Sequence, residues 1–240
     1  MRSVCSVAAE RENLLQDTSG AVMVEFTAAL TVFFLLLFGS VEFANAFYQW
    51  NAATKAVQWG ARVAAVSDPI YVATPADFTA SVSGLNAGDA LPSSATAASN
   101  AYDITCNGSL NTCVCVGLIC PAMGAPKTAA FQRIVYGAAG RTTCVASTSE
   151  RDIGMCHMFD RITLDKVIVR YQFTGLGYAG RPGGPVPTIT VSLGGTTPLQ
   201  FEFILIGGLM KIGNAAFPDF IDLPSFATTV TGEDLTATGS

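Results

Sequence analysis

The strongest constraint on this chain is a segment without charge, which runs for sixteen residues from Phe26 to Val41 between Glu25 and Glu42. Apolar residues continue past Glu42 as far as Tyr48. At about 1.5 Å per residue, a helix from Phe26 to Tyr48 is long enough to cross a hydrocarbon layer about 30 Å thick. A secretory signal peptide would have a shorter apolar core followed by a cleavage site of small residues. The segment therefore predicts one membrane-spanning helix.

The helical pattern extends beyond this apolar segment. The residues that follow are mostly Ala, Val and others that a helix accepts, until Ser67-Asp68-Pro69 supplies a stop signal. Tyr48 and Trp50 lie where an aromatic belt would anchor the outer end of a membrane span. We therefore expect residues 21–48 to form the transmembrane helix and residues 49–68 to continue it outside the membrane.

Glu25 stands at the start of the apolar segment, where a carboxylate is costly unless it is paired. In the first turn of the helix it would gain from the positive end of the helix dipole. Two interpretations stay open at this point. Glu25 either serves the assembly of several helices or marks the cytoplasmic edge of an ordinary signal anchor. Glu42, near the outer end, is expected to be hydrated.

The motif Gly20-Ala21-Val22-Met23-Val24-Glu25-Phe26, followed by the apolar run and by Phe38-Gly39-Ser40-Val41-Glu42-Phe43, resembles the TadE-like family of the tight-adherence (Tad/Flp) pilus system. The resemblance implies a prepilin-type leader over residues 1–20. A prepilin peptidase would cut after Gly20 and leave Ala21 as the new N-terminus. Glu25 would be the pilin-type glutamate, able to pair with the α-amino group of a neighbouring subunit's Ala21, and Phe26 follows in the expected place.

The same resemblance implies a structural function and no enzymatic one. The chain would be a minor pilin-like subunit in the bacterial inner membrane, with its C-terminal domain in the periplasm, acting at the initiation or the tip of a pilus and entering the extracellular fibre. Its partners would be the inner membrane, the prepilin peptidase, other pilin or pseudopilin subunits and the pilus assembly platform. The alternative is an unprocessed, signal-anchored envelope protein with a periplasmic ligand-binding or adhesive domain.

Seven cysteines bear on the compartment, because disulfides persist in oxidising environments. Cys5 precedes the apolar segment, and six cysteines follow it, an even number that fits three disulfides on the outer side of a membrane. The six candidates are Cys106, Cys113, Cys115, Cys120, Cys144 and Cys156. Their pairing is open among fifteen possibilities.

Two features limit how these cysteines pair. On a strand, Cys113 and Cys115 would share a face and would bond to separate partners. Cys144 and Cys156 could close the loop between them. A metal site formed by Cys113, Cys115, Cys120 and His157 is the alternative, but the spacing is not that of a zinc ribbon or finger and thiolates would oxidise outside the membrane, so no metal is expected.

Beyond the helix the sequence predicts two regions. Residues 69–160 read as a loop-rich region containing the cysteines, with a short helix near residues 76–83 and a tight turn at Asn107-Gly108. Residues 161–240 read as an antiparallel β region. Its strands are expected at Ile162–Phe173, Thr188–Leu193 and Pro198–Ile206, with Phe203–Met210 as a core strand and residues 223–235 pairing at a sheet edge. The predicted fold class is α+β: a pilin-like, long N-terminal helix, partly transmembrane, packed on a small antiparallel sheet with disulfide-bonded loops.

Charge and motifs disfavour several other functions. The formal net charge is −5 and the thirteen basic residues are scattered, whereas nucleic-acid binding needs clustered Lys and Arg. His157 is the only histidine, no nucleophile lies in a characteristic sequence setting, and no Walker motif, HExxH or GxSxG is present. We therefore expect no catalytic residues, no cofactor and no nucleic-acid partner.

Overall fold

The computed structural model describes residues 18–72, 85–91, 102–117, 120, 123, 125–147, 149–181, 185–194, 198–204 and 220–232. The chain divides into two compact units. The first comprises residues 1–47 and 203–219, and the second comprises residues 48–202 and 220–240. The expected short helix near residues 76–83 and most of the expected strand at Phe203–Met210 lie outside the described residues.

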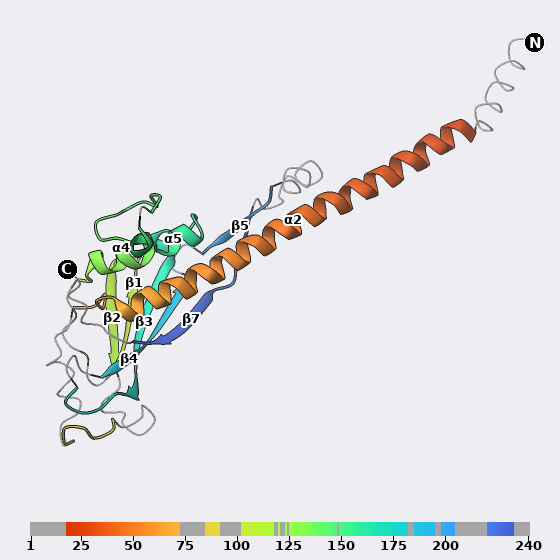
Figure 1. The fold of residues 1–240 in the computed structure, drawn as a ribbon. Coiled ribbons are helices and arrows are strands. Elements are labelled where there is room, and N and C mark those ends of the chain that lie inside the picture. The colour runs from red at the N-terminus through yellow and green to blue at the C-terminus, as the bar shows by residue number, and fades with distance from the viewer. Residues whose placement is uncertain are drawn as a thin grey trace, which may run out of the picture. The chain divides into compact units, whose positions relative to one another are not determined.

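One helix, α2, runs from Thr18 to Val66 (Figure 1). Its 49 residues correspond to a length of about 73 Å at 1.5 Å per residue. It ends directly before Ser67, because Pro69 disfavours helical backbone at the residue before it and cannot donate a helix hydrogen bond. The prediction of a long N-terminal apolar helix that continues beyond the apolar segment is confirmed.

The second unit contains an antiparallel sheet of five strands in the order β2-β1-β3-β4-β7. The strands are β1 (Tyr102–Asn107), β2 (Thr112–Gly117), β3 (Val167–Leu176), β4 (Val186–Leu193) and β7 (Phe226–Thr231). Side chains alternate between a buried and an exposed face, as a strand requires. The predicted α+β class with an antiparallel sheet is confirmed.

The buried face of the sheet meets the second half of α2 and the short helices α4 (Thr128–Tyr136) and α5 (Met155–Met158) in one hydrophobic core. Figure 1 shows the helices on one side of the strands. The sheet contributes large side chains such as Ile104, Tyr171 and Ile189, all fully buried. The helix α2 contributes mostly alanines, of which Ala53, Ala56 and Ala61 have no exposed surface. Small residues let the helix lie close to its neighbours.

The strands differ from the sequence prediction in several details. β1 and β2 lie within the region expected to be loop-rich, joined by the turn predicted at Asn107-Gly108, where Asn107 Oδ1 accepts a hydrogen bond from Ser109 N (2.9 Å). β3 begins at Val167, five residues later than expected, because residues Leu164–Lys166 form a 3-10 turn, η3. In the segment expected as a strand at Pro198–Ile206, the structure describes residues 198–204, and of these only Gln200–Glu202 form a strand, β5. It pairs with β6 (Phe220–Asp222) in a separate two-stranded sheet.

The end of the chain supplies an edge strand, as the sequence predicted. β7 pairs with β4 through six residue pairs from Thr188↔Thr231 to Leu193↔Phe226. β7 therefore lies directly beside β4 at the edge of the sheet. On its other side β4 pairs with β3.

Candidate functional site

The residues singled out from the sequence lie near the start of α2. The expectation that Glu25 lies in the first helical turn is wrong, because the helix already begins at Thr18. Gly20, Ala21, Glu25 and Phe26 are all exposed, and Phe26 keeps 62% of its surface accessible. Ala21 and Glu25 are four residues apart, so they occupy the same side of the helix one turn apart. A Cβ atom added at Gly20 would meet nothing within 4 Å. The described protein therefore leaves this end of the helix open to other molecules.

The apolar segment that follows is exposed on all sides. Every residue from 20 to 37 is exposed, and the helix is long and apolar enough to cross a membrane. Leu36 and Met23 each keep 71% of their surface accessible. An apolar surface of this extent marks a contact with lipid or with other protein. Because apolar residues surround the helix here, this segment has no separate polar and apolar faces.

The hydroxyl groups in this segment are compatible with an apolar environment. Thr27 Oγ1 donates to the carbonyl oxygens of Met23 (3.0 Å) and Val24 (2.9 Å), and Thr31 Oγ1 donates to Thr27 O (2.7 Å). Ser40 Oγ likewise donates to Leu37 O (2.7 Å). Hydrogen bonds to the preceding turn remove the cost of burying these groups in hydrocarbon. The carboxylate of Glu25 has no such backbone partner open to it, since it carries no donor when ionised.

Glu42 does not behave as expected from the sequence. The expectation of a hydrated side chain is wrong, because only 5% of its surface is accessible. The sequence pattern of the helix gives no sign of the burial that the fold imposes at this position. A buried carboxylate is costly unless it is hydrogen-bonded or paired, so the position is chemically constrained.

Outside the apolar segment, polar contacts attach α2 to the domain that carries the sheet. Gln49 Oε1 accepts a hydrogen bond from Arg161 Nη1 (3.1 Å), and Arg161 Nη2 forms an ion pair with Glu202 Oε2 (3.2 Å). The next residue of the helix, Trp50, packs edge-on against Phe226 of β7, with ring centroids 4.7 Å apart. Arg161 could not be singled out from the sequence, because nothing in its local sequence distinguishes it from the other arginines.

Disulfides join the six candidate cysteines in pairs. Cys106 bonds to Cys113 across the β1–β2 hairpin, and Cys115 bonds to Cys120 just after β2. The expectation that Cys113 and Cys115 take separate partners agrees with this arrangement. Cys144 bonds to Cys156 and closes the intervening loop onto α5. Cys5 lies outside the described residues.

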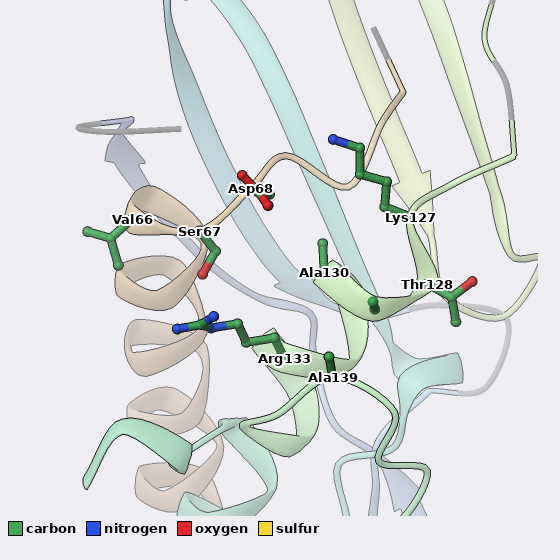
Figure 2. A pocket seen from close by; sticks show the side chains of 9 residues that line it. Val66, Ser67, Asp68, Lys127, Thr128, Ala130, Arg133 and Ala139 are labelled. Carbon is green, nitrogen blue, oxygen red and sulfur yellow. The ribbon is translucent and has the colours of Figure 1, made fainter. Parts of the chain in front are cut away.

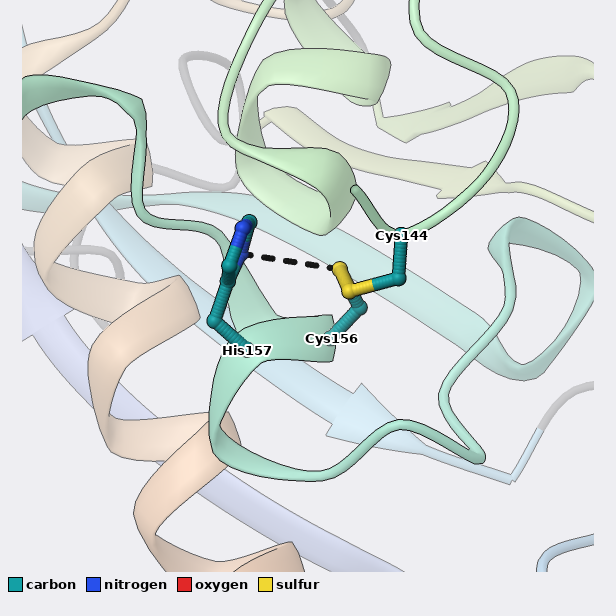
Figure 3. A group of neighbouring side chains, drawn as sticks. All are labelled: Cys144, Cys156 and His157. Carbon is teal, nitrogen blue, oxygen red and sulfur yellow. Dashed lines mark hydrogen bonds between the residues drawn. A yellow bond between two sulfur atoms is a disulfide. The ribbon is translucent and has the colours of Figure 1, made fainter. Parts of the chain in front are cut away.

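His157, the only imidazole of the chain, holds this last loop in place (Figure 3). Its Nδ1 accepts a hydrogen bond from Gly154 N (3.1 Å), so Nε2 carries the proton and donates to Val145 O (2.8 Å). Nδ1 also lies 3.6 Å from Cys156 Sγ. Cys144, Cys156 and His157 form a compact group, but the two sulfurs are bonded to each other and offer no thiolate ligand or nucleophile. The arrangement is that of a structural histidine.

The alternative ligand set, Cys113, Cys115, Cys120 and His157, is not assembled. Its three cysteines are committed to two different disulfides, and its histidine belongs to the loop closed by the third. Several charged groups of the described residues form pairs at the surface. The ion pairs there join Arg141 to Asp152, Arg161 to Glu202 and Arg170 to Asp103 at the surface.

Fold and site together define a class of protein: an α+β domain attached to one N-terminal helix that is able to anchor it in a membrane. Within this class, residues 20–62 match the family described as TadE-like protein, which confirms the family that the sequence resembles. The match starts at Gly20 and ends within α2, so it covers the helix and leaves the rest of the domain unmatched. Comparison with curated proteins and with solved structures gave no match.

The match and the helix together support a membrane-anchored protein associated with the Tad pilus, and the matched family is a structural one. The family match thus lies entirely within the long helix α2.

Proposed function

We propose that this protein is a minor pilin-like subunit that takes part in the initiation or the tip of a Tad/Flp-type pilus. The observation that carries the proposal is the start of α2. There a lone carboxylate, Glu25, follows Gly20 by five residues within an exposed apolar segment of the helix. The family match begins at this same glycine.

In this proposal a prepilin peptidase removes residues 1–20. Cleavage creates a positively charged α-amino group on Ala21, one helical turn before Glu25. In hydrocarbon each of these charges is costly alone, and pairing between neighbouring subunits lowers the cost of both. The pair also fixes the axial register between two helices, as a buried polar group does in a coiled coil.

The proposed orientation places the N-terminus on the cytoplasmic side of the inner membrane and the sheet-bearing domain in the periplasm. The disulfides of that domain support its periplasmic location, because the periplasm is oxidising and the cytoplasm is reducing. The partners are then the inner membrane, the prepilin peptidase, other pilin or pseudopilin subunits and the pilus assembly platform.

The proposal is tested by the mature N-terminus of the protein from cells that contain the prepilin peptidase. We expect intact mass and terminal sequencing to show a chain that begins at Ala21. Gly20→Leu should abolish cleavage and leave the domain folded, since nothing lies within 4 Å of a Cβ atom at Gly20. Gly39→Leu is the matched control, because Gly39 also has open space around it and should not affect processing. A wild-type chain that keeps residues 1–20 under these conditions would instead identify an unprocessed, signal-anchored envelope protein.

A further inference from the structure

Strand β2 (Thr112–Gly117) lies at one edge of the five-stranded sheet, opposite the edge formed by β7. Its six residues pair with β1 in one continuous register, from Tyr102↔Gly117 to Asn107↔Thr112. In the described part of the chain, no second strand pairs with its other side. An edge strand of this kind presents N–H and C=O groups that can bond to a further strand.

The hydrogen bonds between β1 and β3 show which way the backbone of β1 faces. Gly108, directly after β1, donates its N–H to Val167 O (3.1 Å). In an antiparallel ladder the bonded side alternates from residue to residue, so the even-numbered residues of β1 face β3 and the odd-numbered ones face β2. The partners of the odd-numbered residues are Thr112, Val114 and Val116, whose backbone groups therefore bond to β1.

The alternate residues of β2 form the free edge. The N–H and C=O groups of Cys113, Cys115 and Gly117 point away from β1, because those of the residues between them point toward it. The Cα atoms of Cys106 and Cys113 lie 4.0 Å apart, which agrees with a pair that exchanges no ladder hydrogen bonds. Among the described residues, no backbone group of another segment bonds to this edge.

The side chains of β2 on the outer face of the sheet are apolar and exposed. Val114 keeps 57% of its surface accessible and Val116 keeps 70%. β2 carries neither a charged residue nor a proline, and these are the residue types that often keep edge strands from pairing with other chains. β7, at the other edge, exposes only Ala227 and threonines there. The edge of β2 is thus suited to a further strand through both its backbone and its side chains.

The charges beside β2 indicate that such a strand is neutral. Asp103 lies opposite Val116 in the register of the hairpin, and its carboxylate is already paired with Arg170 of β3. β2 itself is uncharged. A charged side chain of a partner would lose hydration at this edge without gaining an opposite charge. The edge therefore favours an uncharged segment.

The direction of the strands limits what can cover β2. All four strand pairings are antiparallel, so β2 and β7 run in the same direction. The outer half of α2 follows β7, since Trp50 packs on Phe226 at its start and Val66 lines a pocket with Thr231 at its end. Antiparallel pairing of β2 with the β2 of a second copy would make the outer halves of the two α2 helices run in opposite directions. That arrangement does not suit two anchors in one membrane.

We propose that β2 binds an extended, uncharged segment of a different protein, which adds a strand to the sheet. The backbone groups of Cys113, Cys115 and Gly117 bond to this segment, and Val114 and Val116 pack against its β-branched or other apolar side chains. The Cys106–Cys113 and Cys115–Cys120 disulfides hold the edge in place before binding, which lowers the entropic cost of association.

This surface is distinct from the other places on the chain where a molecule could bind. It lies away from the start of α2, so binding does not depend on cleavage after Gly20. It is also separate from the pocket at the junction of α2 and α4, which encloses about 440 Å³ and to which β2 contributes no residue (Figure 2).

The test measures binding of a synthetic peptide to the full chain in detergent. The probe is a fluorescently labelled peptide with a core of alternating valines and threonines between lysines that keep it soluble, and fluorescence anisotropy follows its binding. We expect saturable binding with a Kd between about 10 μM and 1 mM. The control peptide has the same side chains but N-methyl groups on its core amides. It should bind at least about tenfold more weakly, because it lacks the N–H donors.

Two variants locate the binding surface. Val116→Lys places a charge on the free edge and should weaken binding of the probe about tenfold or more, since lysine on an edge strand opposes pairing with a further strand. Its melting temperature should stay close to that of the wild type, because the side chain is exposed. Ala227→Lys places the same charge on β7 and should bind as the wild type does. Hydrogen exchange should show added protection at residues 113–117 and none at residues 226–231.

Several results would overturn the proposal. They are the absence of saturable binding up to about 1 mM peptide, equal binding of the N-methylated peptide, and unchanged binding by Val116→Lys. Light scattering without peptide tests a second copy as the occupant. A wild-type dimer that Val116→Lys converts to a monomer would contradict the proposal as well, because β2 would then be covered by another copy of this chain.

Discussion

Gly60 of α2 lies directly against Met155 of α5, so closely that a Cβ atom added at Gly60 would stand 2.5 Å from the Met155 Sδ atom. Met155 is fully buried and has little room to move. A glycine in the middle of a long helix costs about 1 kcal/mol relative to alanine, so it is kept here for the close approach. This contact joins the part of α2 outside the apolar segment to the helices that cover the sheet.

Gly60→Val should lower the free energy of unfolding by about 2 kcal/mol, because the added methyl groups overlap a packed side chain. Denaturant unfolding of the full chain in detergent measures the change. The same substitution in a Met155→Ala background should cost clearly less, since the space it needs is then empty. Equal costs in the two backgrounds would show that backbone effects at Gly60, and not the contact with Met155, decide the result.

Glu25→Gln keeps the size of the side chain and removes its charge. We expect membrane insertion to remain and incorporation into pili to be lost, because a neutral amide cannot neutralise the α-amino group of a neighbouring chain. Immunoblots of membrane and sheared pilus fractions give the two quantities. Val24→Ala, at an equally exposed neighbouring position, is the control and should assemble normally. Normal piliation by the Glu25→Gln strain would rule out the proposed charge pairing.

Cys144→Ser with Cys156→Ser should destabilise the domain by about 2–4 kcal/mol, the usual contribution of a disulfide that restricts the unfolded chain. His157→Ala should have a smaller effect, about 1–2 kcal/mol, because it removes two hydrogen bonds but leaves the covalent link. Thermal unfolding under non-reducing conditions compares the two. A loss in His157→Ala as large as that in the double cysteine variant would mean that the imidazole, more than the disulfide, holds the loop.

Alkaline pH should destabilise the domain. Burial raises the pKa of Tyr71, Tyr102 and Tyr171 above the ordinary value of about 10, because desolvation disfavours the phenolate. Below about pH 10 both the folded and the unfolded states keep these protons, so the stability is fully present there. Above that pH the unfolded chain loses them first, and stability falls as pH rises toward the raised pKa values of the folded state.

Tyrosinate absorbance and far-UV circular dichroism, followed together during an alkaline titration, check this prediction. The part of the tyrosinate absorbance that comes from the buried tyrosines should appear only as the fold is lost. Tyr171 accepts a hydrogen bond from Ile70 N (3.3 Å), so Tyr171→Phe should be less stable at neutral pH, yet its stability should fall less steeply above about pH 10. Full ionisation of all tyrosines in the intact fold would contradict the burial argument.

The sequence by itself determined the features that depend on local pattern. The uncharged segment between Glu25 and Glu42 requires a helix, since in hydrocarbon only internal hydrogen bonds satisfy the backbone. Ser67-Asp68-Pro69 sets where this helix ends, and the residue patterns of 162–173 and 188–193 predicted strands that overlap β3 and β4. These signals arise within a few neighbouring residues, so the sequence is sufficient to read them.

Only the tertiary structure decided what lies beside what. β1 pairs with β3 across about sixty residues of chain, which places Asp103 opposite Gln172. The register of the β1–β2 hairpin places Cys106 opposite Cys113, which selects one disulfide among the possible ones. The burial of Glu42 and the contact of Gln49 with Arg161 likewise depend on segments distant in sequence. The energy of such contacts depends on packing and burial in three dimensions, and no local pattern of residue types encodes those.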